Sequence, residues 1–157
     1  MAALFRWYDR ATLYAENGTY NAGSPQISIA AQPITVALLT STYTFSASAH
    51  NVYADLTNEL TTTGGYTAGG QAVSGLSFTQ ASTVSNLTGS NVVWTASGGG
   101  IAAFRYAVLY INATVNSVVK PLIAAIDNNG ADVPATTAPN TLTVVWNGTG
   151  IWQVTHS

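Results

Sequence analysis

Short stretches of alternating apolar and polar residues, separated by glycine and proline, constrain this fold more than any other feature of the sequence. In residues 141–146 (TLTVVW), Leu142, Val144 and Trp146 fall on one side of an extended chain, and smaller, mostly polar side chains fall on the other. This period of two is typical of a half-buried β-strand. Residues 147–150 (NGTG) tolerate positive φ and precede a second strand-like stretch, so the pattern predicts a C-terminal hairpin.

The same reasoning predicts about eight short strands with no long helix between them. They are expected at residues 4–13, 34–39, 71–78, 92–95, 101–111, 118–126, 141–146 and 151–154. Short strands joined by turns indicate an all-β fold, with antiparallel sheets packed as a β-sandwich or jelly roll. The 157 residues suffice for one domain with its own core. We expect this domain at residues 31–157, after an extended N-terminal arm or a first strand with a loop at residues 1–30.

One segment, residues 101–111 (IAAFRYAVLYI), is apolar on both faces apart from Arg105, and it is therefore predicted to be a central strand. A helix is the competing interpretation, but β-branched and aromatic residues on alternate positions favour a strand. A lone cation in an apolar strand must reach a carboxylate, a carbonyl or solvent, because unpaired burial costs several kcal/mol. Arg105 is predicted to form a structural salt bridge with Asp127 or Asp55, or with a neighbouring subunit.

A single helical turn is expected at residues 52–60, with Asn51 as a possible N-cap. Asp55 and Glu59 lie four residues apart and would share a face of this turn, as paired acids or metal ligands do. A solvated face, or a capping role for Asp55, is the favoured interpretation.

Charged residues are scarce: Asp, Glu, Lys and Arg make up 6% of the chain, against about 25% in ordinary globular domains. Disorder does not explain this, because the chain is 47% hydrophobic. The surface must therefore consist of uncharged polar groups. Such a surface repels its own copies only weakly, which favours a protein whose surface is buried against neighbours.

Composition also argues against two kinds of partner. The four cations, Arg6, Arg10, Arg105 and Lys120, are scattered, whereas nucleic-acid binding uses several cations together. Nucleic acid is therefore not expected as a partner. No stretch approaches the roughly 20 apolar residues that span a bilayer, and residues 1–6 do not resemble a signal peptide, so a membrane partner is not expected either.

Candidate catalytic and metal-binding residues are few. His50 with Asp55 is the only local pair suited to hydrolysis, and a polar loop residue is the favoured interpretation of His50. Residues 127–132 (DNNGAD) weakly resemble a calcium loop but lack its distal glutamate, so an Asn-Gly turn explains them better. We predict no catalytic site, no metal site, no cofactor and no enzymatic activity.

Aromatic residues suggest two kinds of contact. An apolar strip near the N-terminus is suited to clasping a partner, and its candidate contact residues are Phe5, Trp7, Tyr8, Leu13 and Tyr14. Exposed tryptophans can also stack on sugars, so a carbohydrate-binding module using Trp7 or Trp152 stays open as an alternative. Trp94 and Trp146 fall on patterned strands and are predicted to be core residues.

From residue 34 to residue 154 the order of segments resembles a family of small virion proteins of tailed bacteriophages, which includes head decoration (cement) proteins. The segments that carry the resemblance are Val36–Thr40, Asp55–Glu59, Gly65–Val73, Val93–Trp94, Ala103–Tyr110, Lys120–Ala124, Val145–Asn147 and Gly150–Ile151. The resemblance implies repeated, non-enzymatic attachment to the outer surface of a capsid, and host cytoplasm as the location before assembly. The implied partners are the major capsid protein and further copies of the chain, with a trimer favoured. A tail or receptor-binding fibre component is the structural alternative.

Overall fold

The computed structural model describes residues 3–9, 11, 32–115 and 117–155; for Gln80 and Val154 only the backbone is described. Strands account for most of the regular structure in these residues, so the predicted all-β fold is confirmed, with twelve strands where about eight were expected. The strands are β1 (Leu4–Trp7), β2 (Ile34–Leu39), β3 (Gln71–Ala72), β4 (Ser77–Ala81), β5 (Val84–Thr88), β6 (Val92–Thr95), β7 (Tyr106–Ile111), β8 (Thr114–Val115), β9 (Val118–Val119), β10 (Leu122–Asp127), β11 (Thr141–Val144) and β12 (Trp152–Thr155).

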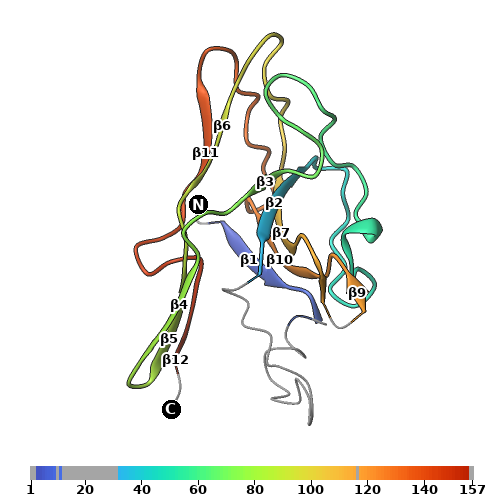
Figure 1. Ribbon diagram of the computed structural model, residues 1–157. Helices are drawn as coiled ribbons and strands as arrows, with labels where there is room; N and C mark the ends of the chain where they lie inside the picture. The colour runs from blue at the N-terminus through green and yellow to red at the C-terminus, as the bar shows by residue number, and fades with distance from the viewer. Residues whose placement is uncertain (1–2, 10, 12–31, 116, 156–157) are drawn as a thin grey trace.

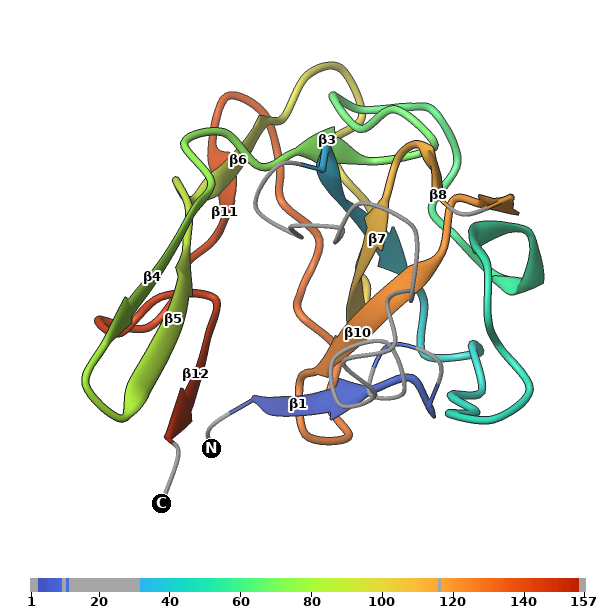
Figure 2. The ribbon, with the colours of Figure 1, turned by 60° about the horizontal axis from the view of Figure 1, so that its bottom comes forward.

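The strands form one large sheet and three smaller ones, and all of the described pairings are antiparallel. The large sheet has the order β1-β10-β7-β2-β3, and a three-stranded sheet has the order β12-β5-β4. Two-stranded sheets are formed by β11 with β6 and by β8 with β9. The β4, β5 and β12 strands stand to one side of the large sheet (Figures 1 and 2). The sandwich or jelly-roll arrangement stays a prediction.

Strand β7 lies in the middle of the five-stranded sheet, as the apolar run predicted. All six of its residues are buried. Alternate side chains enter two separate cores, with Leu109 in the first and Val108 and Tyr110 in the second. The first core continues into Leu87, and we call it the main core. Because both faces of the sheet are covered, β7 needs no polar face, which explains its continuous apolar sequence.

The second core is covered by the segment between β2 and β3. Tyr43 is buried there, and Phe45, Tyr53 and Leu56 pack against it from the outside. This segment contains a short 3-10 helix, η2 (Tyr53–Asp55). None of the helices in the described part of the chain is long and apolar enough to cross a membrane.

The predicted C-terminal hairpin is wrong, because β11 pairs with β6 and β12 pairs with β5. Trp146 shows why: its backbone N–H donates to Asn91 Oδ1 at 3.2 Å, and its indole N–H donates to the Ser90 carbonyl at 2.9 Å. The chain leaving β11 is therefore held beside the connection between β5 and β6. Residues 84–95 and 141–155 consequently run antiparallel to each other across two sheets.

Several predicted strand boundaries are also corrected. The strand expected at 71–78 divides into β3 and β4 around Gly75, and the one at 118–126 divides into β9 and β10 beside Lys120; both residues have positive φ, which turns the chain. The strand at 101–111 is shortened at its start, where Ile101 and Phe104 form only isolated bridges. The strand at 4–13 is described only as β1, and β5 and β8 were not predicted.

The helical turn expected at 52–60 is reduced to η2, and its N-cap is Val52 rather than Asn51. The Asp55 carboxylate accepts the backbone N–H groups of Asn51 at 2.7 Å and of Val52 at 2.9 Å. The capping role predicted for Asp55 is thus confirmed, and Asn51 is a donor to this cap because its own N–H points at the carboxylate.

The outer edge of β2 is completed by a side chain. Strand β3 covers only Thr35 and Val36, so Leu38 lies beyond its end. The Leu38 N–H donates to the hydroxyl of Tyr66 at 3.0 Å, and the Leu38 carbonyl accepts the Leu60 N–H at 2.9 Å. Tyr66 is 2% exposed. The edge of the sheet is therefore satisfied without a further strand.

We expect Tyr66→Phe to lower the free energy of unfolding by about 1–3 kcal/mol, because a buried backbone N–H loses its acceptor. Urea unfolding measures this change. Tyr53→Phe is the matched control, since both tyrosines donate to Glu59 but the Leu38 N–H at the edge of β2 donates to Tyr66 and not to Tyr53. Equal destabilisation by the two variants would contradict the role assigned to Tyr66.

Candidate functional site

The N-terminal aromatic residues form part of the fold. Strand β1 pairs with β10, and the side chains of Phe5 and Trp7 pack half-buried against the main core. The Trp7 ring meets Trp152 edge-on, with 5.0 Å between ring centroids, and meets Phe5 at 5.1 Å. These contacts join β1 to β12, so both candidate contact residues are largely engaged inside the chain.

Tyr8 is wrongly predicted as a contact residue, because its side chain is 0% exposed and fills the second core. Its hydroxyl lies 2.9 Å from the hydroxyl of Tyr43, which in turn lies 2.7 Å from Nδ1 of His50. Burial raises the pKa of both tyrosines. His50 thus pairs with Tyr43, in the loop where the His50–Asp55 pair was considered. The remaining candidates, Leu13 and Tyr14, lie outside the described residues.

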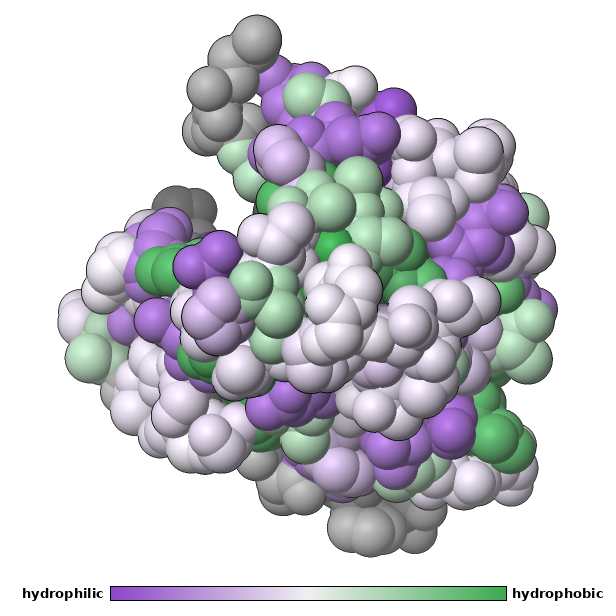
Figure 3. Space-filling model, turned by 90° about the horizontal axis from the view of Figure 1, so that it is seen from above, coloured by the Kyte–Doolittle hydropathy of each residue, from purple (hydrophilic) through white to green (hydrophobic). Residues whose placement is uncertain are grey.

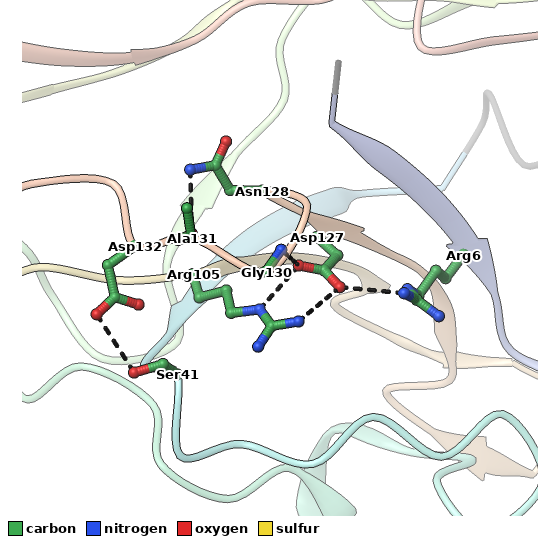
Figure 4. A network of polar contacts seen from close by, with 8 residues as sticks. All are labelled: Arg6, Ser41, Arg105, Asp127, Asn128, Gly130, Ala131 and Asp132. Atoms are coloured by element: carbon green, nitrogen blue, oxygen red, sulfur yellow. Dashed lines mark hydrogen bonds and ion pairs between the residues drawn. The ribbon is translucent and has the colours of Figure 1, made fainter. Parts of the chain in front are cut away.

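Arg105 forms a bidentate ion pair with Asp127, one of the two partners that the sequence suggested (Figure 4). Arg105 Nε lies 2.9 Å from Asp127 Oδ1, and Nη2 lies 3.0 Å from Oδ2. Arg6 Nη2 approaches the same carboxylate at 3.2 Å. Asp127 is 1% exposed, and it connects β1, the end of β10 and the residue preceding β7.

The two arginines determine the electrostatics around Asp127. The hydrogen bond from Arg105 is the main cause that lowers the pKa of Asp127, and the same bond raises the pKa of Arg105. The Gly130 N–H also donates to Oδ1, at 3.2 Å, while Asp132 accepts the Ser41 hydroxyl at 3.3 Å. The loop at 127–132 is therefore organised by contacts within the chain. In residues 3–9, 11, 32–115 and 117–155, no three His, Asp or Glu side chains gather as a metal site requires.

Glu59 lies in a cluster of tyrosines. Its carboxylate accepts the hydroxyls of Tyr53 and, at 2.6 Å, Tyr66, and it also accepts the Gly69 N–H at 2.7 Å. The Gly69 carbonyl accepts the hydroxyl of Tyr110 at 2.7 Å. Burial is the main cause that raises the pKa of these three tyrosines. Glu59 and Asp55 bind different groups and do not act as paired acids, and the cluster fastens the loop after η2 to the sheet.

Each of the four tryptophans packs against the main core. Trp94 is buried, whereas Trp7, Trp146 and Trp152 are partly buried. The Trp146 indole N–H is already bound to a backbone carbonyl, and Trp7 and Trp152 meet in a T-shaped ring contact. Stacking of a sugar on an open aromatic face is therefore poorly supported.

Sequence reasoning did not identify one exposed and uncharged surface among the described residues. The outward-facing residues of β6 and β11, with Val145 just beyond, are all exposed and uncharged. We call them the β6–β11 outer face: Val93, Thr95, Thr141, Thr143 and Val145. Val93 is 42% exposed and Val145 is 67% exposed. The alternation of residues 141–146 could have predicted this exposed face, because the side of the strand opposite Leu142 carries only threonine and valine.

No protein-family model matches the chain, and comparison with curated proteins and with solved structures found no match. Functional inference therefore depends on the contacts described above and on the order of segments in the sequence.

We expect Asp127→Asn to destabilise the fold at neutral pH and to flatten its response to acid. Because the pKa of Asp127 is below its ordinary value of 3.8 in the folded chain, the ion pair stabilises the fold above that value and is lost as pH falls through the folded pKa. Urea midpoints measured from pH 7 down to pH 2 test this.

Asp132→Asn is the control, since it removes an exposed carboxylate from the same loop. It should leave most of the acid response in place. An unchanged acid response in Asp127→Asn would contradict the role given to this carboxylate.

Proposed function

We propose that this chain is a structural protein of a tailed bacteriophage particle, a decoration protein that binds the outer surface of the head and stabilises the shell. It acts by binding, without catalysis, and its partners are the major capsid protein and further copies of itself. The proposal rests on one observation, a chain with few charged residues, several of which, among the described residues, are engaged in contacts within the chain. The order of sequence segments supports the assignment to phage particles.

Four charged residues show how charges are engaged within the chain. Arg6 and Arg105 both bind Asp127, while Asp55 and Glu59 accept hydrogen bonds from backbone and tyrosine donors. The face seen in Figure 3 is mostly of intermediate hydropathy, and its hydrophilic residues form small separate groups. Few ionic groups would have to lose water when such a face packs against a partner.

The β6–β11 outer face is the surface that we assign to contact with another copy of the chain. Its valines and threonines are uncharged and, apart from Val145 just beyond β11, lie on paired strands, so two such faces can approach without like-charge repulsion. Interface centres are depleted of charged residues in the same way. Contacts of this kind fit a symmetric oligomer, and a trimer is the form we propose.

Copy number in the particle distinguishes the head from the tail. We expect quantitative mass spectrometry of purified phage particles that encode the chain to find hundreds of copies. The purified chain should bind assembled shells saturably and raise their disruption temperature, because a ligand that binds only the assembled state stabilises it by mass action. Dispersed capsid subunits, which should not bind, are the control.

A handful of copies, found with tail proteins, would replace this proposal with a tail component. Absence of the chain from particles, or binding to a glycan array, would overturn a structural role in the virion.

We expect Val93→Lys to weaken self-association of the purified chain by at least about tenfold, because a charge would have to be buried in the contact. Sedimentation equilibrium measures the change. Ala135→Lys adds the same charge at an exposed position outside β6 and β11, and it should associate like the unmodified chain. Equal weakening of self-association by both variants would show that net charge, and not the β6–β11 outer face, is responsible. An unmodified chain that stays monomeric at high concentration would contradict the proposed contact between copies.

A further inference from the structure

The sequence contains three Asn-Gly pairs, at residues 17–18, 129–130 and 147–148, the first of which lies outside the described residues. Asn-Gly is the dipeptide most prone to loss of the side-chain amide, because glycine leaves its own backbone nitrogen unobstructed. We infer that Asn147 is a site of spontaneous conversion to aspartate and isoaspartate, and that the fold protects Asn129. The two sites differ in what binds the reacting groups.

At Asn147 the carbonyl of the side-chain amide is activated. Its Oδ1 accepts the backbone N–H of Thr149 at 2.8 Å and the hydroxyl of Thr149 at 2.5 Å. Two donors directed at one oxygen stabilise the negative charge that develops there when a nucleophile attacks the carbonyl carbon. The ring closed by the Thr149 N–H contains both Cγ of Asn147 and the nitrogen of Gly148, so the reacting atoms belong to one compact turn.

The attacking nitrogen at this site is accessible. Asn147, Gly148 and Thr149 are all exposed, and a Cβ built on Gly148 meets no atom within 4 Å. Within the part of the chain that the structure describes, the Gly148 N–H donates no hydrogen bond. Water can therefore reach the turn both to accept the amide proton and to complete the reaction.

At Asn129 the corresponding nitrogen is held in place. The Gly130 N–H donates to Oδ1 of Asp127 at 3.2 Å, and that carboxylate is fixed by Arg105. Asn129 itself has a φ of 50°, in the left-handed region. To react, Gly130 would have to break a hydrogen bond to a charged acceptor, which is stronger than one to a neutral group. The ion pair around Asp127 thus protects this site.

The reaction at Asn147 needs only water. The Gly148 nitrogen gives its proton to solvent and forms a bond to Cγ of Asn147, and the side-chain nitrogen takes up a proton and leaves as ammonia. The resulting five-membered imide is opened by water at either carbonyl, giving aspartate or isoaspartate. The net change exchanges an amide and water for a carboxylic acid and ammonia. The new carboxylate lies two residues from Val145, at the end of the β6–β11 outer face.

Peptide mapping of the folded full-length chain, aged in mildly alkaline buffer, tests the inference. We expect isoaspartate and a mass gain of about 1 Da to accumulate at Asn147 and to be at least about tenfold slower at Asn129. The same incubation in denaturant should bring the two rates close together. Faster or equal reaction at Asn129 in the folded chain, or a difference that persists in denaturant, would overturn the inference.

Variants separate activation from simple exposure. Thr149→Val removes the hydroxyl donor but keeps the shape and the backbone N–H, and it should slow reaction at Asn147 about five- to tenfold. Thr149→Ser keeps the donor and should react like the unmodified chain. Asp127→Asn should speed reaction at Asn129, with circular dichroism confirming that it remains folded. An unchanged rate in Thr149→Val would exclude activation by Thr149, and an unchanged rate at Asn129 in Asp127→Asn would exclude protection by the carboxylate.

Discussion

Burial of the central strand on both faces is the constraint from which the rest of the structure follows. All six residues of β7 are buried, so both faces of its sheet must be covered. The main core brings in Leu87 of β5 and Leu142 of β11, and the second core brings in the segment that contains Tyr43. A cover made of a loop and short strands offers few strands that could pair with the edges of the sheet. Side chains must therefore bind the backbone groups at these edges, as the Tyr66 hydroxyl does for the Leu38 N–H.

The few charged residues act at the places where this cover is fastened. Asp127 binds two arginines where β1, β10 and the start of β7 meet, and Glu59 binds the tyrosines that hold the loop after η2. Each carboxylate accepts hydrogen bonds from several donors, which offsets the cost of removing it from water. Because the chain has few charged side chains and uses several of them in contacts within the fold, its outer surface consists largely of threonine, serine and small apolar residues.

Local patterns predicted the strands, and long-range contacts decided their pairing. The bounds expected for residues 34–39 and 92–95 match β2 and β6, because β2 is buried along its whole length and Val92 and Trp94 alternate as buried residues in β6. The hairpin predicted at 141–154 is wrong because Trp146 is bound to Ser90 and Asn91, which no local pattern reveals.

The salt bridge of Arg105 was predicted from the sequence, since the cost of burying an unpaired charge is independent of topology. Tyr8 was misplaced because an aromatic strip has the same sequence in an arm as in a core.

An uncharged contact surface has a physical advantage in the role that we propose. Attraction between exposed charges weakens as salt rises, because the Debye length shortens from about 10 Å at 0.1 M to about 3 Å at 1 M. A particle released from its host meets changing ionic strength, and contacts between threonine and valine faces are nearly unaffected by it. Such contacts are individually weak, but repetition on a symmetric lattice multiplies them, since each attached copy raises the effective concentration of the next contact. Repetition therefore compensates for the weakness of each neutral contact, and a chain with few ions is suited to the repeated binding to a shell that we propose.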